Sequence, residues 1–272
     1  MLDDVSDIRS YYDSATEREL ARLGRHQLEH DITWLYLDRY LPSEGAVLDI
    51  GAGAGGYTVE LARRGYTVTA VDLSGKLIEL CRKRVSEAGL AKNVTFLVAD
   101  ARDLRDVGHG PFDAVLLMGP LYHLVLEEDR RTALREAFDR LRPGGVILSA
   151  FISRYGVLGD VMNNIPEWIE DQADVRSLIE HGRRPDNKPV GGFRGYFAEV
   201  SEIAPLHEDA GFRTLVVAGA EPAISADDES YNRLEGLRRQ LWLALLYELS
   251  TEESIIAASR HLLYIGRKPE GE

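Results

Sequence analysis

Residues 47–56 have the sequence Val-Leu-Asp-Ile-Gly-Ala-Gly-Ala-Gly-Gly, which is the clearest indication in the chain of how it folds. The apolar residues at 46–50 predict a buried strand, and glycines directly after a strand allow a tight turn that brings the backbone close to a ligand. Residues 57–64 then have the spacing of a helix that ends at Gly65. A strand, a glycine loop and a helix in this order predict a nucleotide site, with the polar end of the ligand at the helix N-terminus.

The same alternation of short apolar runs and helical patterns continues beyond this loop. Further strands are predicted at 67–71, 94–98, 112–118 and 146–152, with helices between them. Five strands separated by helices over about 110 residues predict βαβ units, an α/β fold with a parallel sheet and right-handed crossovers. Two later strands, at 214–218 and 261–265, predict an antiparallel pair that completes the sheet.

The regular alternation fails in several segments outside this core, so we expect one domain with added parts. Leu234, Leu237, Leu241, Leu245 and Leu249 share one helix face, which predicts packing in the core, under a lid or against a second copy of the chain. The expected parts of the single domain, residues 1–272, are an N-terminal helical cap at 1–42, a cofactor-binding core at 43–152, an inserted lid at 153–198, and the C-terminal part of the sheet with a helical insertion at 199–272.

Composition excludes several classes of protein. The chain has 32 Lys and Arg against 45 Asp and Glu, a net charge of −13, which disfavours a sequence-independent grip on nucleic acid or anionic lipid. A single cysteine, Cys81, excludes an intrachain disulfide and a thiolate metal cluster, and we expect no metal. The acidic N-terminus has no apolar run, and the apolar stretches are too short to span a bilayer, so we expect a cytoplasmic protein.

The glycine loop fits more than one class of nucleotide. Gly51, Gly53 and Gly56, with Asp72 about 20 residues beyond, also match the fingerprint of NAD enzymes. Two carboxylates favour a different ligand. Asp49, just before the glycines, suits a ligand with a positive charge, such as an ammonium or a sulfonium, and Asp100 follows the third strand, where it can accept a hydrogen bond from an adenine amine.

Taken together, the motifs resemble those of class I S-adenosylmethionine-dependent methyltransferases, in particular small-molecule enzymes of the ubiquinone/menaquinone-biosynthesis-like and glycine-N-methyltransferase-like type. The resemblance implies a Rossmann-like sheet of seven mostly parallel strands in the order 3-2-1-4-5-7-6, with strand 7 antiparallel and helices on both faces. It also implies S-adenosylmethionine as cofactor and S-adenosylhomocysteine as product. The motifs are VLDIGAGAGG at 47–56, VDLS at 71–74, ADA at 99–101, FDAVL at 112–116, GPLYHL at 119–124 and LRPGG at 141–145.

The resemblance assigns roles to individual positions. Asp72 would bind both ribose hydroxyls, Asp100 and Ala101 would contact the adenine, and Leu73 and Arg102 would flank its ring. The cofactor-binding residues that it implies are Tyr12, Asp49, Gly51, Ala52, Gly53, Gly55, Asp72, Leu73, Asp100, Ala101, Arg102, Met118, Gly119 and His123.

The chemistry of methyl transfer limits what the protein must supply. A sulfonium is an activated donor, so the protein mainly aligns the reactants; a hydroxyl or carboxyl acceptor benefits from a base, and a neutral amine does not need a strong one. His123 is the candidate base and Tyr122 a candidate aromatic wall for the sulfonium, although both positions also suit packing. Residues expected to bind the acceptor are Tyr11, Tyr122, Arg154, Tyr155, Phe193, Tyr196 and Phe197.

His26 and His30 lie four residues apart, but no third metal ligand is evident near them. This pair therefore predicts a solvated helix face and not a metal site.

The sequence thus predicts an enzyme that transfers a methyl group to a nitrogen or oxygen of a small molecule by in-line displacement. An NAD-dependent oxidoreductase and a non-catalytic cofactor-binding module stay open as alternatives. A nucleic-acid methyltransferase is a further alternative, disfavoured by the charge and by Gly119-Pro-Leu-Tyr. That sequence stands where amino-methylating nucleic-acid enzymes carry Asn/Asp-Pro-Pro-Tyr/Phe.

Overall fold

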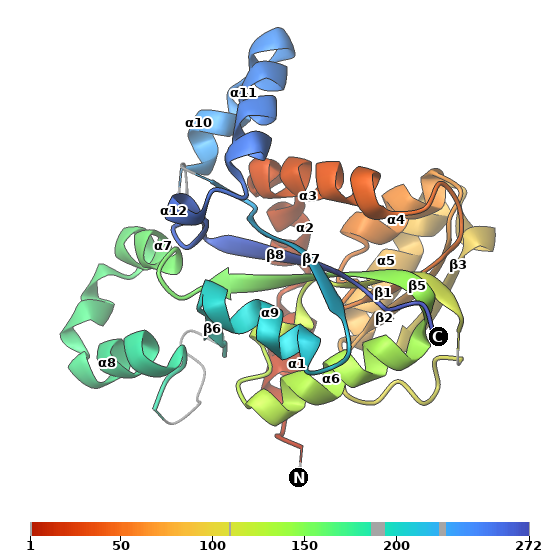
Figure 1. The fold of residues 1–272 in the computed structure, drawn as a ribbon, viewed down its shortest axis with the longest axis horizontal. Helices are drawn as coiled ribbons and strands as arrows, with labels where there is room; N and C mark the ends of the chain where they lie inside the picture. Colours follow the sequence, from red (N-terminus) through yellow and green to blue (C-terminus); the bar gives the residue numbers. More distant parts are fainter. Residues whose placement is uncertain (1, 109, 186–193, 223–226, 272) are drawn as a thin grey trace.

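One mixed sheet organises the chain in the computed structural model, which describes residues 2–108, 110–185, 194–222 and 227–271. Its strand order is β3-β2-β1-β4-β5-β8-β7, with the short β6 beside β5 (Figure 1). Apart from this additional two-residue strand, the order is the predicted one. The strands are β1 (Ala46–Ile50), β2 (Thr67–Asp72), β3 (Val94–Val98), β4 (Phe112–Leu117), β5 (Leu141–Ser153), β6 (Phe197–Ala198), β7 (Arg213–Gly219) and β8 (His261–Arg267).

Pairing within the sheet is parallel from β3 to β5 and antiparallel at β8. β8 pairs antiparallel with both β5 and β7, as the sequence predicts. One boundary differs from the prediction, because β5 begins at Leu141 and not at 146. The register between β4 and β5 shifts between the pairs Phe112–Leu141 and Ala114–Val146. Pro143, Gly144 and Gly145 therefore lie in an irregular stretch of the strand, and they do not separate it from the preceding helix.

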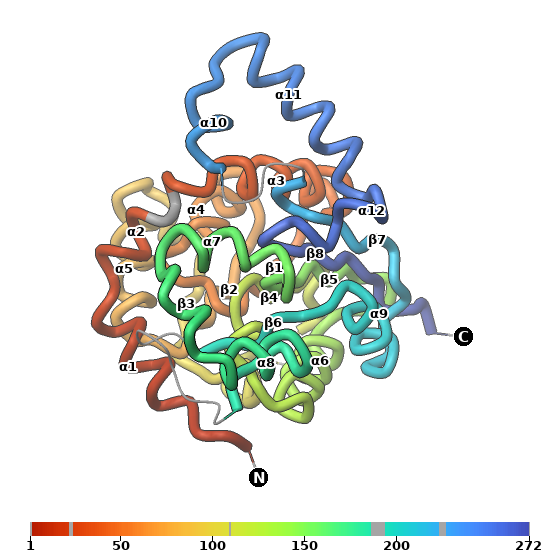
Figure 2. Tube along the Cα trace, turned by 90° about the vertical axis from the view of Figure 1, so that its left-hand side faces the viewer, coloured from red at the N-terminus to blue at the C-terminus, as the bar shows by residue number. Residues whose placement is uncertain are grey.

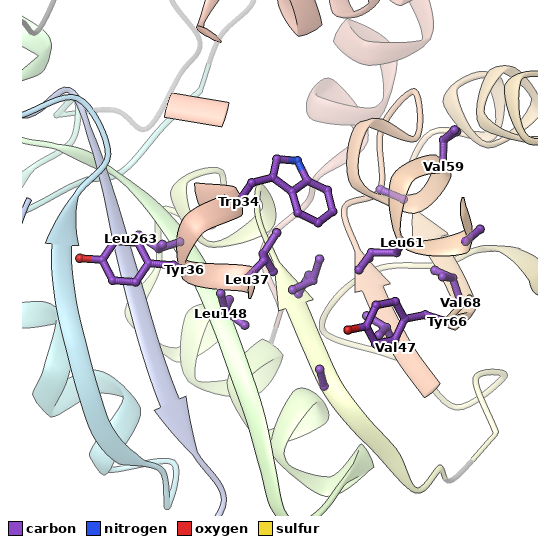
Figure 3. Packing of buried hydrophobic residues seen from close by; sticks show 14 of the residues in the cluster. Trp34, Tyr36, Leu37, Val47, Val59, Leu61, Tyr66, Val68, Leu148 and Leu263 are labelled. Carbon is purple, nitrogen blue, oxygen red and sulfur yellow. The ribbon is translucent and has the colours of Figure 1, made fainter. Parts of the chain in front are cut away.

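Helices cover both faces of this sheet (Figure 1). Side chains alternate along β1, so that Val47 packs in one hydrophobic cluster and Leu48 in the other. Trp34 and Leu37 pack over the first face, as Figure 3 shows. The first face is covered by α3 (Gln27–Tyr40), α4 (Gly56–Arg63) and α5 (Gly75–Glu87), and the second by α6 (Glu127–Arg140) and α9 (Val200–Glu208).

The remaining helices lie in the segments added to the core. In both views α10 and α11 project from the body of the molecule (Figures 1 and 2). Only part of the predicted leucine face is packed: Leu234, just before α11, packs against the first hydrophobic cluster, whereas Leu237 is 68% and Leu241 61% exposed on the single chain. The helices are α1 (Ser6–Ser14), α2 (Thr16–Arg25), α7 (Val157–Asn164), α8 (Gln172–His181), α10 (Asp228–Asn232), α11 (Gly236–Leu249) and α12 (Glu253–Ile256), with short 3-10 turns η1 (Ala91–Asn93), η2 (Pro120–Tyr122) and η3 (Pro166–Glu170).

A search of the described residues finds no helix of the length and apolar character that crossing a membrane requires.

Candidate active site

A cavity opens at the carboxyl ends of β1 to β4, where open α/β sheets bind ligands. The sheet supplies the segments just after each strand, and the helices at the N-terminus supply the opposite wall. The residues that line the cavity are Val5, Ile8, Tyr12, Glu19, His26, Glu29, His30, Ile50, Gly51, Ala52, Gly53, Ala54, Gly56, Tyr57, Asp72, Leu73, Leu77, Ala99, Asp100, Ala101, Met118, Gly119, Pro120, Tyr122, His123 and Leu124.

Two positions of the glycine loop show why it contains glycine. Gly51 has φ +80°, and a Cβ atom there would lie 2.6 Å from Cδ of Pro120. Gly53 has φ +56°, but a Cβ on it would meet no atom within 4 Å. Gly51 thus allows the loop to pack against the end of β4, whereas the position of Gly53 borders the open space of the cavity.

Asp72 places a carboxylate at the end of β2, with 9% of the residue exposed. One oxygen accepts a hydrogen bond from the amide of Gly53 and the other from the amide of Ser74, both at 2.8 Å. Burial raises the pKa of Asp72 to about 6, although these two hydrogen bonds act to lower it. Each carboxylate oxygen can accept a second hydrogen bond, so Asp72 is suited to hold two neighbouring hydroxyls of a ligand.

His123 and Tyr12 meet in the cavity from opposite walls. The Tyr12 hydroxyl lies 2.6 Å from Nε2 of His123, and Nδ1 of His123 lies 2.9 Å from the carbonyl oxygen of Arg194. A carbonyl oxygen only accepts hydrogen bonds, so Nδ1 carries a proton. In the neutral ring, Nε2 therefore accepts the proton of Tyr12 and is the basic atom of the pair.

A buried ionic network adjoins the cavity beside His26 and Glu29. Nδ1 of His261 lies 2.9 Å from an oxygen of Glu221 and 3.5 Å from an oxygen of Glu29. The guanidinium of Arg260 contacts Glu221 and lies 2.8 Å from Nδ1 of His26. His26 is thus part of a buried network, and the prediction of a solvated helix face is wrong for it.

Charges in this network stabilise one another. Burial alone would raise the pKa of Glu221, but His261 and Arg260 lower it to about 2. Burial would lower the pKa of His261, yet Glu29 and Glu221 raise it overall. Oxygen and nitrogen atoms of His26, Glu221 and Asp228 come close enough to hold a cation, and the guanidinium of Arg260 contacts all three.

Comparison with known proteins identifies the class of enzyme. A sequence model described as a methyltransferase domain matches residues 47–145. The chain is 28% identical to the tRNA 5-carboxymethoxyuridine methyltransferase of Escherichia coli (strain K12) over 267 aligned residues. This alignment covers 94% of each of the two chains. It is 40% identical over 114 residues to a ubiquinone biosynthesis O-methyltransferase of Caulobacter sp. (strain K31), 42% of this chain and 43% of that protein.

The chain is an S-adenosylmethionine-dependent methyltransferase. Its fold is similar to that of magnesium protoporphyrin IX methyltransferase from Synechocystis PCC 6803 with bound SAH, with a TM-score of 0.60, 17% identity, and coverage of 97% of this chain and 100% of that one. The methyltransferase prediction is confirmed over the oxidoreductase alternative.

The cavity of this methyltransferase fits its cofactor. Asp72 offers acceptors for the ribose hydroxyls, and the open space at Gly53 leaves room for a ligand against the loop. Leu73 and Ala101 offer apolar surface beside Asp100, whose carboxylate is held by the guanidinium of Arg102. The expected cofactor contacts that line the cavity are Tyr12, Gly51, Ala52, Gly53, Asp72, Leu73, Asp100, Ala101, Met118, Gly119 and His123.

Three expected cofactor contacts are not among the lining residues of the methyltransferase. Asp49 is buried and accepts a hydrogen bond from the Thr58 hydroxyl at 2.6 Å. A Cβ on Gly55 would lie 2.6 Å from the sulfur of Cys81, so this glycine faces the protein interior. Arg102 is 5% exposed, because its guanidinium is held by two carboxylates; the partners are Asp100 at 2.6 Å and Asp129 at 2.9 Å.

Most residues expected to bind the acceptor also lie elsewhere. Arg154 is 3% exposed and pairs with Glu199 at 2.7 Å and Glu202 at 2.9 Å. These ion pairs connect the end of β5 to the start of α9. Tyr196 is buried, with its hydroxyl bonded to Glu202. Arg154 and Tyr196 therefore stabilise the inserted segment and do not line the cavity.

The other expected acceptor residues divide in the same way. The Tyr11 hydroxyl accepts a hydrogen bond from Arg18 on the outside of α1, and Tyr155, 43% exposed, donates to Glu199. Phe197 forms part of β6 and is not a lining residue, and Phe193 lies outside the described residues. Tyr122 alone of these expected residues, among the part of the chain that the structure describes, lines the cavity.

Sequence reasoning named Tyr12 but missed the rest of the wall that the N-terminal helices provide. Glu19, His26, Glu29 and His30 line the cavity there, and Tyr57 lines it from α4. One signal was present, since His26, Glu29 and His30 have the spacing of one helix face. The contacts of His26 with Asp228 and Arg260, and that of Glu29 with His261, join residues more than 200 positions apart and give no local signal.

Proposed function

We propose that this methyltransferase acts on a hydroxyl oxygen of a small molecule, with His123 as the base. The orientation of the His123 ring carries this proposal. Its Nδ1 donates to the carbonyl oxygen of Arg194, which leaves Nε2 as a basic atom that faces Tyr12 in the cavity. A hydroxyl acceptor must lose its proton during methyl transfer, and a positioned imidazole is the side chain best suited to take it near neutral pH.

Bound S-adenosylmethionine would supply a methyl group already activated on a sulfonium, whose sulfur would keep the electron pair of the carbon–sulfur bond when the acceptor oxygen takes the methyl. His123 takes the hydroxyl proton on Nε2, either directly or through the Tyr12 hydroxyl, and the Arg194 carbonyl stabilises the imidazolium that results. Tyr122, beside His123 with ring centroids 4.8 Å apart, would add an aromatic surface next to the positive charge.

A small acceptor is supported by the enclosure of the cavity and by the charge of the chain. Val5, Ile8 and Tyr12 place the N-terminal segment over the cavity as one of its walls. The net charge of −13 disfavours a long polyanion.

A nucleoside of tRNA is the second candidate, and one observation favours it. The E. coli relative, whose name describes a tRNA methyltransferase, matches 94% of this chain, including the added segments. The ubiquinone biosynthesis O-methyltransferase matches 42%. Because the added segments border the acceptor side, the longer match bears more directly on the acceptor.

An acceptor screen with radiolabelled S-adenosylmethionine tests both proposals. The panel pairs phenols and aliphatic alcohols with amines of matched shape, and adds bulk tRNA from cells that lack this enzyme. We expect label in hydroxyl compounds, and a fall in kcat of about a hundredfold or more for His123→Gln with S-adenosylhomocysteine affinity little changed. Label in amines at an undiminished rate in His123→Gln contradicts the role of His123. Label in tRNA alone replaces the small-molecule proposal with the second candidate.

A further inference from the structure

The N-terminal segment before and within α1 forms a wall of the cavity, and Figure 2 shows α1 alongside α5. Val5 and Ile8 face the cavity from this segment, and Tyr12 reaches Nε2 of His123. The segment is also tied to the core at its end, because the Ser74 hydroxyl donates to the carboxylate of Asp13 at 2.5 Å. Access to the cavity from this side therefore depends on what holds the segment in place.

Two buried arginines bind the start of this segment. Arg102 donates to the carbonyl oxygen of Asp3 at 2.9 Å. Arg194, 8% exposed, donates to the Asp3 carboxylate at 2.8 Å and to the carbonyl oxygen of Asp4 at 2.6 Å, and lies 3.2 Å from the Asp7 carboxylate. Arg194 comes from the inserted segment, about 190 residues away in the sequence, so this contact joins two added parts of the chain across the cavity.

The backbone of Arg194 also contacts His123, the proposed base. Its carbonyl oxygen accepts the Nδ1 proton of His123 at 2.9 Å. Two residues further on, the amide of Tyr196 donates to the carbonyl oxygen of Tyr122 at 2.7 Å, which fixes this stretch of backbone beside His123. Both ring nitrogens of His123 are thus held, one by the backbone of Arg194 and the other by Tyr12, which belongs to the segment that the Arg194 side chain anchors.

We infer that Arg194 is a positioning residue that makes closure of the cavity by the N-terminal segment and the orientation of His123 depend on each other. Removing its guanidinium leaves Asp3 and Asp7 without this partner and weakens the attachment of the start of α1, where the hydrogen bond from Arg102 to Asp3 remains, because several charge-assisted hydrogen bonds are lost together. Tyr12 then leaves Nε2, and the backbone at 194 loses the anchor that holds its carbonyl against Nδ1. The part of this inference that concerns catalysis rests on the proposed function of His123, whereas the closure of the cavity does not.

The test uses the full-length enzyme and two readouts that need no acceptor. Calorimetry measures the affinity for S-adenosylhomocysteine, and nitrogen-15 NMR of the imidazole rings reports the tautomer of His123, whose signal is assigned by its loss in His123→Gln. For Arg194→Gln we expect an affinity about tenfold lower and a His123 signal that is no longer that of a single Nδ1-protonated ring. Arg194→Lys should restore part of both. Arg105→Gln is the matched control, since Arg105 is exposed and pairs with Asp103 at 2.7 Å, and it should change neither.

Variants of the partners keep the test decisive if Arg194→Gln does not fold. Asp3 and Asp7 are partly exposed, and the double variant Asp3→Asn, Asp7→Asn should reproduce both changes. Combined with Arg194→Gln, it should add little to either single effect. Full additivity, or an unchanged affinity and tautomer in Arg194→Gln, overturns the inference. Failure of the acceptor screen alone would remove the proposed function and leave these two readouts intact.

Discussion

The two walls of the cavity are built by different means. The sheet wall consists of short segments after β1 to β4, and neighbouring parts of the backbone hold its residues, as the amides of Gly53 and Ser74 hold Asp72. The opposite wall consists of helix side chains that are held by partners far away in the sequence, as Arg260 holds His26. The first wall holds the residues that we expect to bind the cofactor, and we propose that the second faces the acceptor. We expect substitutions in the first wall to alter folding and cofactor affinity, and those in the second to alter closure and specificity.

Gly51→Ala should give the largest effect and tests whether the sheet wall tolerates change. Its φ of +80° and the 2.6 Å approach to Pro120 predict a loss of about 3 kcal/mol in the free energy of unfolding, measured by urea denaturation. Gly24→Ala is the control in the N-terminal helices, where a Cβ meets no atom within 4 Å. It should stabilise by about 0.5 kcal/mol. Equal effects of the two would remove the distinction between the walls.

Asp72→Ala should weaken S-adenosylhomocysteine binding about a hundredfold, or about 2.7 kcal/mol, through the loss of the charged acceptor for two hydroxyls. Calorimetry measures this affinity. Asp106→Ala, an exposed aspartate after β3, should leave it unchanged. A fall of less than threefold in Asp72→Ala would mean that the cofactor does not depend on the end of β2.

Arg154→Ala distinguishes a structural role from the acceptor role that the sequence suggested. Loss of the buried guanidinium leaves Glu199 and Glu202 without their partner, so the free energy of unfolding should fall by about 2 kcal/mol, with cofactor affinity unchanged. Arg176→Ala in the same inserted segment removes an exposed ion pair with Glu180 and should cost less than about 0.5 kcal/mol. An increased KM for the acceptor without loss of stability would show that Arg154 binds the acceptor and has no structural role.

Cofactor affinity should fall at acid pH. Burial raises the pKa of Asp72 to about 6, so the carboxylate that accepts two hydroxyls is lost as the pH falls below that value. S-adenosylhomocysteine affinity should be about half its plateau value at pH 6 and about tenfold lower at pH 5 than at pH 7. In Asp72→Asn the affinity for S-adenosylhomocysteine should be low and should not change with pH over this range. An equal slope in Asp72→Asn would assign the titration to another group.

Leu241→Ser should have the smallest effect on the free energy of unfolding, because this leucine lies outside both walls of the cavity. Leu241 is 61% exposed on α11, so its loss should change the free energy of unfolding by less than about 0.5 kcal/mol. Leu246, on the same helix, is 3% exposed, and Leu246→Ala should cost about 2–3 kcal/mol. A large cost for Leu241→Ser that varies with protein concentration would show that a second copy of the chain covers this face.

Local patterns predicted the sheet and most of the cofactor wall. Strand order, the antiparallel final pair and the position of Asp72 and Gly53 at the cavity follow from apolar periodicity and from motifs a few residues long. The errors at Arg102 and Arg154 have one cause. An arginine just after a strand can point into a cleft or turn back to a carboxylate, and Asp129 and Glu202, the carboxylates that decide this, lie 27 and 48 residues away.

The sequence by itself determined the class of fold and the cofactor, because a glycine loop between strand and helix and a carboxylate at the next strand end act through nearby backbone. The tertiary structure alone decided which helix side chains line the cavity. His26 and Glu29 belong to the cavity because Glu221, Arg260 and His261 fold against them. Ion pairs between segments about 200 residues apart depend on how whole elements pack, and no local pattern specifies that packing.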